Sequence, residues 1–425
     1  MVIGGGAREH ALVARLASEP DASEVICAPG NPGISAIART VPADVSRPDT
    51  LVTLAAREQI DFTVVGPEAP LSLGIADCFA ADNRLLLGPT AAAARLESSK
   101  AFAKAFMDRH AVPTARFRVF DSADEALACV RSGEFGFPVV LKADGLAAGK
   151  GVVIANDEAQ AEAGVTAAMI EGRFGDAGSR LVIEECLAGP EVSFFVISDG
   201  MRALPIGTAQ DHKRIFDDDG GPNTGGMGAF APSPLVDRAM HARVMRDIVE
   251  PVLAGMSAEG YPFQGFLYVG LMLTTSGPKV IEFNVRLGDP EAQVILPLLA
   301  APVLPVLIAA ARGQMLQSAI RLSEEKLVGV VIASRGYPES ADSGRSISGI
   351  ADAERTAGVS VYHAATASRN GQLVTAGGRV LTVVGRGDTF ADAIDRAYAG
   401  VARISFDGMQ YRKDIGKKAL LEDRR

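Results

Sequence analysis

The chain has 425 residues, of which 48% are hydrophobic and 45 are glycine. It is too long for one ordinary core, so we expect two to four domains of mixed α and β structure. The net charge of −9 and the pI near 5.3 argue against a protein that binds nucleic acid or acidic membranes. Four scattered cysteines without a CxxC pair suggest neither a zinc knuckle nor a disulfide framework, and they fit a reducing, cytoplasmic location.

No segment predicts secretion or a membrane span. The N-terminal sequence MVIGGGAREHAL lacks the basic start and long apolar core of a signal peptide. Residues 294–311 carry no charge and are about long enough to cross a bilayer. Three prolines interrupt this stretch, so we expect a buried helix with a broken start.

The first 98 residues predict a parallel sheet. A short strand that begins almost at Met1 leads into Gly4–Gly6 and a helix whose apolar face carries Leu12 and Leu16. Further strands are expected at 24–29, 61–66 and 84–88. Strands that alternate with helices indicate a parallel sheet with a ligand crevice at the carboxyl ends.

The glycines at positions 4–6 match the dinucleotide pattern GxGxxG only in part, because Glu9 stands at its last position. NAD binding is therefore weakly indicated. A phosphate at the helix N-terminus, assisted by Arg8, remains open.

The middle of the chain predicts a change of architecture. Ser99 is expected to cap a helix at 100–110. An α+β unit of about seventy residues is expected next. It comprises strands around 137–157, a helix at 157–170, and strands at 180–187 and 191–198. A polar, glycine-rich loop at 210–230 follows, and then a hairpin that turns at Ser276-Gly277-Pro278.

From about residue 314 a last unit is expected. It contains strands at 327–338 and 377–387 and a helix at 388–404. Phe390, Ile394, Tyr398 and Val401 mark the apolar face of that helix.

The stretch LKADGLAAGKGVVIA, residues 141–155, resembles a Walker loop but fails its pattern. Only three residues separate Gly145 from Gly149, and Gly151 follows Lys150 where a hydroxyl residue is required. Two interpretations stay open: a glycine loop that covers phosphates, or a hairpin turn between two strands.

Glu282 and Asn284 lie two apart on an expected strand, so they share a face. Carboxylate and amide oxygens suit Mg²⁺, which fills its coordination shell with phosphate and water. Arg286 would join the same face if the strand continued. The alternative is a polar, solvent-facing strand edge.

Other candidate groups follow strand ends. Lys142 could reach phosphate oxygens, and Glu184, Glu185 and Glu191 could contact adenine and ribose, although charged strand ends are usually only solvated. The 210–230 segment holds an unusual density of groups capable of chemistry, namely Asp211, His212, Lys213, Arg214, Asn223 and Thr224. Loops longer than about twelve residues are often functional.

Taken together, the motifs resemble one family. Twelve motifs occur along the chain in this order: GGGAREHAL, APGNPG, VVGPEAPL, SSKAFAKAFM, PVVLKADGLAAGKGV, IEECLAGPEVSFFV, QDHKR, GPNTGGMGAF, GFLYVGLM, VIEFNVRLGDPE, GGRVLTVVG and YRKDIG. The chain resembles the glycinamide ribonucleotide synthetase family of ATP-grasp enzymes along essentially its whole length.

The resemblance implies an α/β and α+β multidomain fold. An N-terminal parallel α/β sheet domain (1–98) would hold phosphoribosylamine, an ATP-grasp domain (99–313) would carry a flap at about 118–189, and a small C-terminal α+β domain would cover 314–425. The implied reaction is ATP-dependent ligation of glycine to 5-phosphoribosylamine through glycyl phosphate, in purine biosynthesis. The implied cofactors are ATP and Mg²⁺ or Mn²⁺, in a cytoplasmic monomer with no nucleic acid or membrane partner.

The resemblance also implies site residues. The ATP contacts would be Lys100, Lys142, Gly145, Gly149, Lys150, Gly151, Glu184, Glu185, Leu187 and Glu191. Glu282 and Asn284 would bind the metal. Glycine would be activated near Arg286, Asp289, Lys213, Asn223 and Gly226. The phosphoribosylamine site would include Gly6, Arg8, Gly30, Asn31, Gly66, Pro67, Glu68 and Asp211.

Three rival hypotheses remain at this point: an NAD-dependent oxidoreductase, another ATP-grasp carboxylate–amine ligase or carboxylase, and a non-catalytic binding module. Two positions depart from the family pattern, since Ala365 and Ala376 stand where Gly and Asn are usual. These departures affect the detail of the last domain, not the expected reaction.

Overall fold

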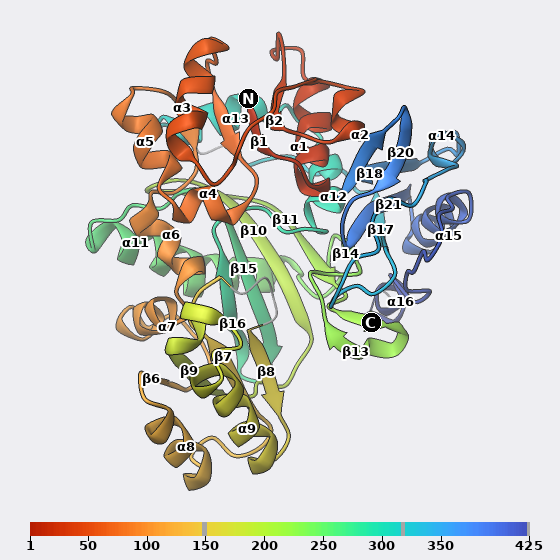
Figure 1. Ribbon diagram of the computed structural model, residues 1–425. Helices are drawn as coiled ribbons and strands as arrows, with labels where there is room; N and C mark the ends of the chain where they lie inside the picture. Colours follow the sequence, from red (N-terminus) through yellow and green to blue (C-terminus); the bar gives the residue numbers. More distant parts are fainter. Residues whose placement is uncertain (147–150, 316–318, 423–425) are drawn as a thin grey trace.

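The computed structural model describes residues 1–146, 151–315 and 319–422 (Figure 1). The N-terminal part is a five-stranded sheet of order β3-β2-β1-β4-β5, parallel throughout. Its strands are β1 Val2–Gly4, β2 Ile26–Pro29, β3 Arg39–Thr40, β4 Thr63–Val65 and β5 Leu86–Leu87. The predicted parallel sheet is confirmed. The two-residue edge strand β3 escaped prediction because it has no apolar pattern.

Short helices cover this sheet. They are α1 Ala7–Ala17, α2 Pro32–Ser35, α3 Pro48–Arg57, α4 Glu68–Ser72, α5 Ile75–Ala81 and α6 Ala91–Ser98. Helix α1 buries Leu12 and Leu16, as its apolar spacing predicts.

A small unit at the bottom of Figure 1 has a four-stranded sheet of order β6-β9-β7-β8. Its strands are β6 Phe117–Phe120, β7 Val139–Ala143, β8 Val152–Ala155 and β9 Leu181–Glu185. Helices α8 Ala123–Ser132 and α9 Glu158–Val165 share its apolar core. We call this unit the flap unit.

The expected α+β unit of about seventy residues included the strand at 191–198, and this part of the expectation is wrong. This strand, β10 Glu191–Asp199, pairs with β11 Ala203–Asp211 and β15 Gln264–Thr274 instead. All of its residues after Glu191 are buried. A strand that is apolar on both faces needs cover on both sides, and only the large sheet provides it.

The large sheet has eight strands in the order β16-β15-β10-β11-β14-β17-β21-β18. Its other strands are β14 Gly228–Ala231, β16 Gly277–Asn284, β17 Lys326–Ala333, β18 Val359–His363 and β21 Arg379–Gly387. Strand β14 pairs with β17, so the sheet runs without interruption across residue 313, where we expected a domain boundary. The predicted hairpin is β15–β16, and its turn lies between Thr274 and Gly277.

The remaining elements flank these sheets. They are α7 Lys100–Arg109, α10 Arg238–Val244, α11 Glu250–Ala258, α14 Ile350–Glu354, the hairpin β19 Thr366–Arg369 and β20 Gln372–Thr375, α15 Phe390–Val401 and α16 Lys417–Glu422. Helix α15 packs Phe390 and Val401 into the C-terminal core, as predicted.

The segment 210–230 is not the irregular loop we expected. It holds β12 Arg214–Phe216 and β13 Gly220–Asn223, which form a hairpin before β14. The guanidinium of Arg412 is fully buried beneath it and donates to Asp219 and to the carbonyl of Arg214, each at 3.0 Å. Because Arg412 is so distant in sequence, the regular structure of this segment could not be predicted from its local residues.

The apolar stretch 294–311 is buried and broken, as predicted. It forms α12 Ala292–Ile295, a 3₁₀ turn at Leu296–Leu298 and α13 Leu304–Ala311, which share a core with Leu12 and Leu16 of α1. Within the described ranges, no helix is long and apolar enough to span a membrane.

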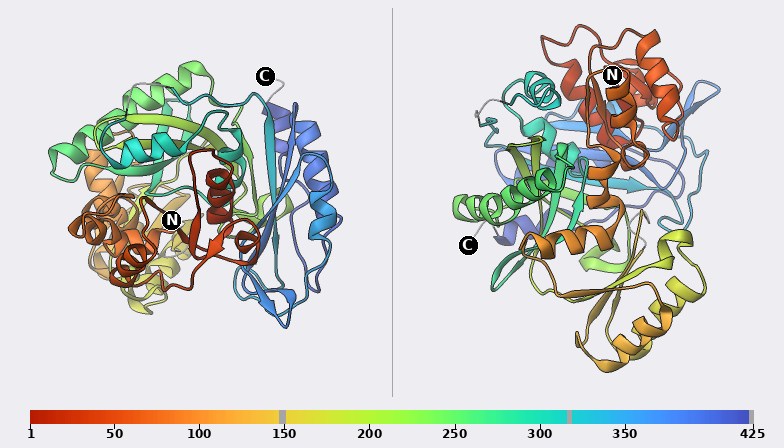
Figure 2. Two further views of the ribbon diagram at one scale, coloured as in Figure 1. Left: turned by 90° about the horizontal axis from the view of Figure 1, so that it is seen from above. Right: turned by 90° about the vertical axis from the view of Figure 1, so that its left-hand side faces the viewer.

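Two buried histidines join the N-terminal and C-terminal parts, which lie side by side in Figure 2. The amide of His363 in β18 donates to Nδ1 of His10 in α1 at 2.8 Å. Burial lowers the pKa of His10 to about 3 and that of His363 to about 4. Both rings are therefore neutral in the folded chain near pH 7.

This contact predicts a stability loss in mild acid. Below the ordinary histidine pKa of about 6.5, the two histidines are protonated in the unfolded chain but stay neutral in the folded chain. The free energy of unfolding therefore falls as the pH drops toward 4. In His10→Gln, we expect the loss between pH 7 and pH 5 to be about 2 kcal/mol smaller than in the unsubstituted chain. Urea unfolding at both pH values measures it, and parallel losses in the two proteins would contradict the assignment.

Candidate active site

The start of helix α7 is fixed to the start of the glycine loop. Asp144 accepts hydrogen bonds from the Ser99 hydroxyl at 3.2 Å and the Ala101 amide at 3.1 Å, while Ser99 caps the helix as predicted. The Lys100 ammonium donates to the carbonyl of Gly145 at 2.8 Å. A lysine and a helix N-terminus therefore face this loop.

The glycine loop joins two antiparallel strands, since Lys142 of β7 pairs with Val152 of β8 and the amide of Ala143 donates to the carbonyl of Gly151 at 2.8 Å. The strands on either side of the loop therefore pair as both interpretations require. Gly149 and Lys150 lie outside the described residues. A role of the loop in covering phosphates remains a prediction.

The flap unit contacts strand β16 through charged side chains. The Lys142 ammonium pairs with the buried carboxylate of Glu184 and donates to the carbonyl of Ile281 at 2.9 Å. Glu185 pairs with Lys279 at 3.3 Å and with Arg116 at 3.0 Å. These contacts connect the expected adenine hinge to the expected metal strand.

Leu187 is the last residue of the expected hinge, and Glu191 begins the next strand, β10. Glu191 pairs with Lys213 at 2.5 Å, which brings the QDHKR segment to the same side of the large sheet. The role of Leu187 in binding adenine stays a prediction.

Strand β16 holds Glu282 opposite Gly270 and Asn284 opposite Tyr268. Burial opposes ionisation of Glu282, but Lys213, Lys142 and Lys100 outweigh it and hold the pKa of that carboxyl below its usual value. Among the described residues the Glu282 carboxylate accepts no hydrogen bond. Its oxygens are therefore charged and free to bind a cation.

The described residues contain no cluster of three or more His, Cys, Asp or Glu side chains that could hold a metal by themselves. One carboxylate and one amide oxygen on a strand face fit a hard cation that takes its other ligands from phosphate and water. The solvent-facing interpretation of β16 does not explain the lysines gathered around Glu282.

Strand β16 ends at Asn284, so the condition under which Arg286 would share the face of Glu282 and Asn284 is not met. The amide of Val285 donates to the Glu97 carboxylate at 2.7 Å instead of joining the strand ladder. Arg286 nonetheless stays beside Asn284, to which it donates at 3.3 Å, and it pairs with Glu97 at 2.7 Å and Glu68 at 3.2 Å.

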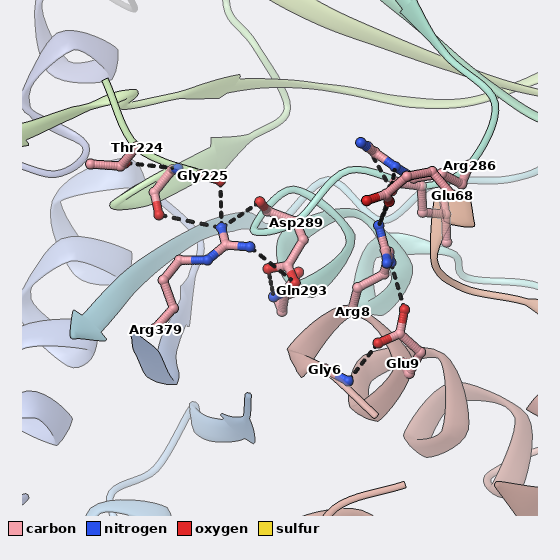
Figure 3. A network of polar contacts seen from close by, with 12 residues as sticks. Gly6, Arg8, Glu9, Glu68, Thr224, Gly225, Arg286, Asp289, Gln293 and Arg379 are labelled. Atoms are coloured by element: carbon pink, nitrogen blue, oxygen red, sulfur yellow. Dashed lines mark hydrogen bonds and ion pairs between the residues drawn. The ribbon is translucent and has the colours of Figure 1, made fainter. Parts of the chain in front are cut away.

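A second arginine organises the glycine-rich segment (Figure 3). Arg379, the first residue of β21, donates to the carbonyls of Gly225 at 2.5 Å and Asp289 at 2.6 Å, and pairs with the Asp289 carboxylate at 3.4 Å. Gly226 has φ +108°, and a Cβ there would lie 2.5 Å from Pro290, so glycine is required. Arg379 was missed because an arginine at a strand start carries no pattern of its own.

The loop after β1 is filled by the chain's own carboxylate (Figure 3). Glu9 accepts from the Gly6 amide and from Arg8 Nε, each at 2.6 Å. A Cβ at Gly66 would lie 2.1 Å from Glu9 Oε1. The glycines here make room for Glu9, so the interpretation as a dinucleotide motif loses its basis.

Asn31 caps α2 and donates to the carbonyls of Gly5 at 2.9 Å and His363 at 2.8 Å. Gly30, with φ +76°, precedes it. Pro67 caps α4, and Glu68 begins that helix and faces Arg286 and Arg8. The expected phosphoribosylamine residues therefore gather at the carboxyl ends of the parallel strands, except Asp211.

Asp211 lies at the end of β11, in the large sheet. Burial raises its pKa to about 7, with the charges of Glu291 and Glu191 adding to the effect and Lys213 opposing it. Its charge interacts with those of Lys213, Glu291, Glu191 and Glu282 rather than with a group of the N-terminal sheet.

Comparison with known proteins decides the family. Three family models match consecutive parts of the chain: the N domain of phosphoribosylglycinamide synthetase over residues 1–97, its ATP-grasp (A) domain over 98–292 and its C domain over 327–418. The chain belongs to the phosphoribosylglycinamide synthetase family. The predicted ATP-dependent ligase with an ATP-grasp fold is thereby confirmed.

Relatives agree along the whole chain. The phosphoribosylamine–glycine ligase of Xylella fastidiosa is 50% identical over 427 residues, which cover 100% of this chain and 98% of that protein. The ligase of the same name from Ralstonia nicotianae is 48% identical over 421 residues, with 99% of each covered.

Solved structures agree as well. The crystal structure of the Thermotoga maritima phosphoribosylamine–glycine ligase is 32% identical, with a TM-score of 0.85 over 97% of this chain and 98% of that one. A Campylobacter jejuni biotin carboxylase at 17% identity, with a TM-score of 0.73 over 98% and 93% of the two chains, shares the fold.

The Arg379 contacts give a testable prediction. Arg379→Met removes the donor that holds Gly225 and Asp289, so we expect turnover to fall at least tenfold while the melting temperature drops by only a few degrees. Arg335→Met, which removes ion pairs with Asp407 and Asp342 on the surface, is the matched control and should keep its activity. Steady-state phosphate release and calorimetry measure both, and normal turnover in Arg379→Met would contradict the role.

Proposed function

We propose that this chain ligates glycine to 5-phosphoribosylamine with ATP, giving glycinamide ribonucleotide, ADP and phosphate. The observation that carries the proposal is the meeting of two surfaces. The oxygen-bearing face of β16, with Glu282, lies within the field of Lys100 and Lys142, which belong to the start of α7 and to the flap unit. A triphosphate between them would be bound from both sides.

In the nucleotide site, Lys100, Lys142 and the 145–151 loop would contact the phosphates, Glu184 to Leu187 would bind the adenine edge, and Glu191 the ribose. A divalent cation, Mg²⁺ or Mn²⁺, would be held by Glu282 and Asn284. When bound, it supplies positive charge to the phosphate oxygens and orients them.

In the glycine site, Arg286, Asp289, Lys213, Asn223 and Gly226 would bind and orient the amino acid. Lys213 and Arg286 are cations on the side of Glu282. They suit a carboxylate that accepts a phosphoryl group, because such a transfer depends on positioning and on neutralised charge.

In the amine site, Gly6, Arg8, Gly30, Asn31 and the Gly66–Glu68 turn would bind 5-phosphoribosylamine, with Asp211 near the reacting end. This site would lie at the carboxyl edge of the parallel sheet, where ligands bind in such folds. The backbone turns there and Arg8 would bind the phosphate.

The reaction follows from these placements. The glycine carboxylate attacks the γ-phosphorus, the bond to the β-phosphate oxygen breaks, and ADP leaves. The amine nitrogen then attacks the carbonyl carbon of glycyl phosphate, the C–O bond to phosphate breaks, and the nitrogen gives up a proton. A flap closed over the site would keep water from the acyl phosphate.

Three further points of the proposal concern the molecule as a whole. We propose a monomer with division of the chain at about residues 98 and 313, acting in the cytoplasm. The separate flap sheet, ending at Glu185, supports a flap at about 118–189.

The decisive experiment is phosphate release from ATP with glycine and phosphoribosylamine generated in situ. We expect release to require both substrates and to fail when alanine or bicarbonate replaces glycine. Release that depends on a different acid would favour another ATP-grasp ligase or a carboxylase instead.

The metal assignment has its own prediction. Glu282→Gln keeps the size of the side chain but removes its charge, so we expect turnover to fall by at least about a hundredfold with little change in melting temperature. Glu324→Gln is a matched control on the exposed segment before β17. Two results would contradict the metal assignment. One is equal activity of Glu282→Gln and the unsubstituted enzyme, and the other is full turnover in the absence of any divalent cation.

A further inference from the structure

A buried triad of charges connects helix α7 to the hinge of the flap unit. Each oxygen of the Glu184 carboxylate pairs with a different lysine, Oε2 with Lys104 and Oε1 with Lys142. The exposed fractions of the three side chains are 3% for Lys104, 4% for Glu184 and 10% for Lys142. Two cations and one anion leave one net positive charge in this triad.

Both ends of the triad are held by backbone carbonyls of strand β16, one of them through the hydroxyl of Thr114. The Lys104 ammonium also donates to the Thr114 hydroxyl at 2.8 Å, and that hydroxyl donates to the carbonyl of Val280 at 2.7 Å. At the other end, Lys142 donates to the carbonyl of Ile281 at 2.9 Å. The chain of contacts therefore begins and ends on adjacent residues of β16.

The charge balance explains why two lysines are present. A buried carboxylate paired with Lys142 alone would cancel the charge that Lys142 offers to a phosphate. With Lys104 on its second oxygen, Glu184 is already neutralised. Lys142 then keeps its positive charge for the proposed nucleotide site, next to Lys100 and Glu282.

We propose that Lys104 is a positioning residue for ATP: by neutralising Glu184 it leaves the charge of Lys142 available to the triphosphate. Lys104 lies one helical turn after Lys100 on α7. It contacts Glu184, the first residue of the expected hinge, and would not touch the nucleotide itself. The inference rests on the proposed function, because it takes the nucleotide to lie between the flap unit and β16.

The test compares nucleotides that differ in phosphate charge. In Lys104→Met we expect calorimetric binding of ATP to weaken about tenfold, equal to about 1.4 kcal/mol, and binding of AMP to change less than about twofold. Equal losses for ATP and AMP would overturn the inference, since they would mean that Lys104 only shapes the adenine hinge. The measurement is made at pH 7, where Lys104 carries its charge, because burial lowers its pKa only to about 8.

A matched control and a rescue sharpen this test. Lys279→Met removes a lysine from the neighbouring Glu185, which keeps Arg116 as a partner, and it should bind ATP within about twofold of the unsubstituted chain. The double variant Lys104→Met with Glu184→Gln restores one net positive charge. We expect it to bind ATP better than Lys104→Met alone, and a further loss would overturn the inference.

The variant is expected to fold, since Glu184 keeps Lys142 as a partner and no buried charge is left unpaired. A melting temperature within a few degrees of the unsubstituted chain checks this. If the unsubstituted chain bound neither ATP nor AMP, the proposed function itself would be overturned. If the unsubstituted chain bound both nucleotides and Lys104→Met bound each of them with the same affinity, only the role of Lys104 would be overturned.

Discussion

The site depends on how one partly buried cation, Arg286, is neutralised. Arg286 lies two residues after the end of β16, and a guanidinium in that position requires carboxylates around it. Glu97 at the end of α6 and Glu68 at the start of α4 supply them. Because both belong to the N-terminal part, this arginine fixes the carboxyl edge of the parallel sheet to the end of β16. The proposed amine site and the proposed metal site are thereby held next to each other.

Other charged contacts extend the same arrangement to the rest of the chain. Arg379 reaches from the C-terminal part to Asp289 and the glycine-rich segment, and Lys142 reaches from the flap unit to β16. The large sheet gives these contacts a common frame, since it runs from β16 to β18 without a break. The flap unit, the start of α7 and the segment after β11 thus bring lysines to Glu282, while Arg379 of the C-terminal part holds Asp289. An enzyme that must keep an acyl phosphate away from water needs such convergence.

Much of this architecture was predictable from local sequence. The alternation of strands and helices before Ser98, the cap at Ser99, and the shared face of Glu282 and Asn284 follow from periods that a strand or helix imposes. The inclusion of β10 in the expected α+β unit failed because sequence order does not tell which sheet a buried strand joins. The hairpin at 214–223 was missed because Arg412, almost two hundred residues later, holds it.

The site shows the same division. Single residues with a recognisable spacing could be predicted, whereas those that act through distant partners could not. Lys104, Glu97 and Arg379 look ordinary in sequence, and only their contacts with Glu184, Arg286 and Asp289 reveal them. Glu9 is the opposite case, because its position spoils a familiar glycine pattern, and the structure shows that the glycines accommodate its side chain.

The central claim is that the metal strand and the flap unit bind one nucleotide from opposite sides. Crystals grown with Mn²⁺ and a non-hydrolysable ATP analogue test it most directly, through the anomalous signal of the metal. The account predicts a peak between the side-chain oxygens of Glu282 and Asn284, with the phosphates lying between it and Lys142. A peak elsewhere, or a nucleotide that contacts only one of the two surfaces, would contradict it.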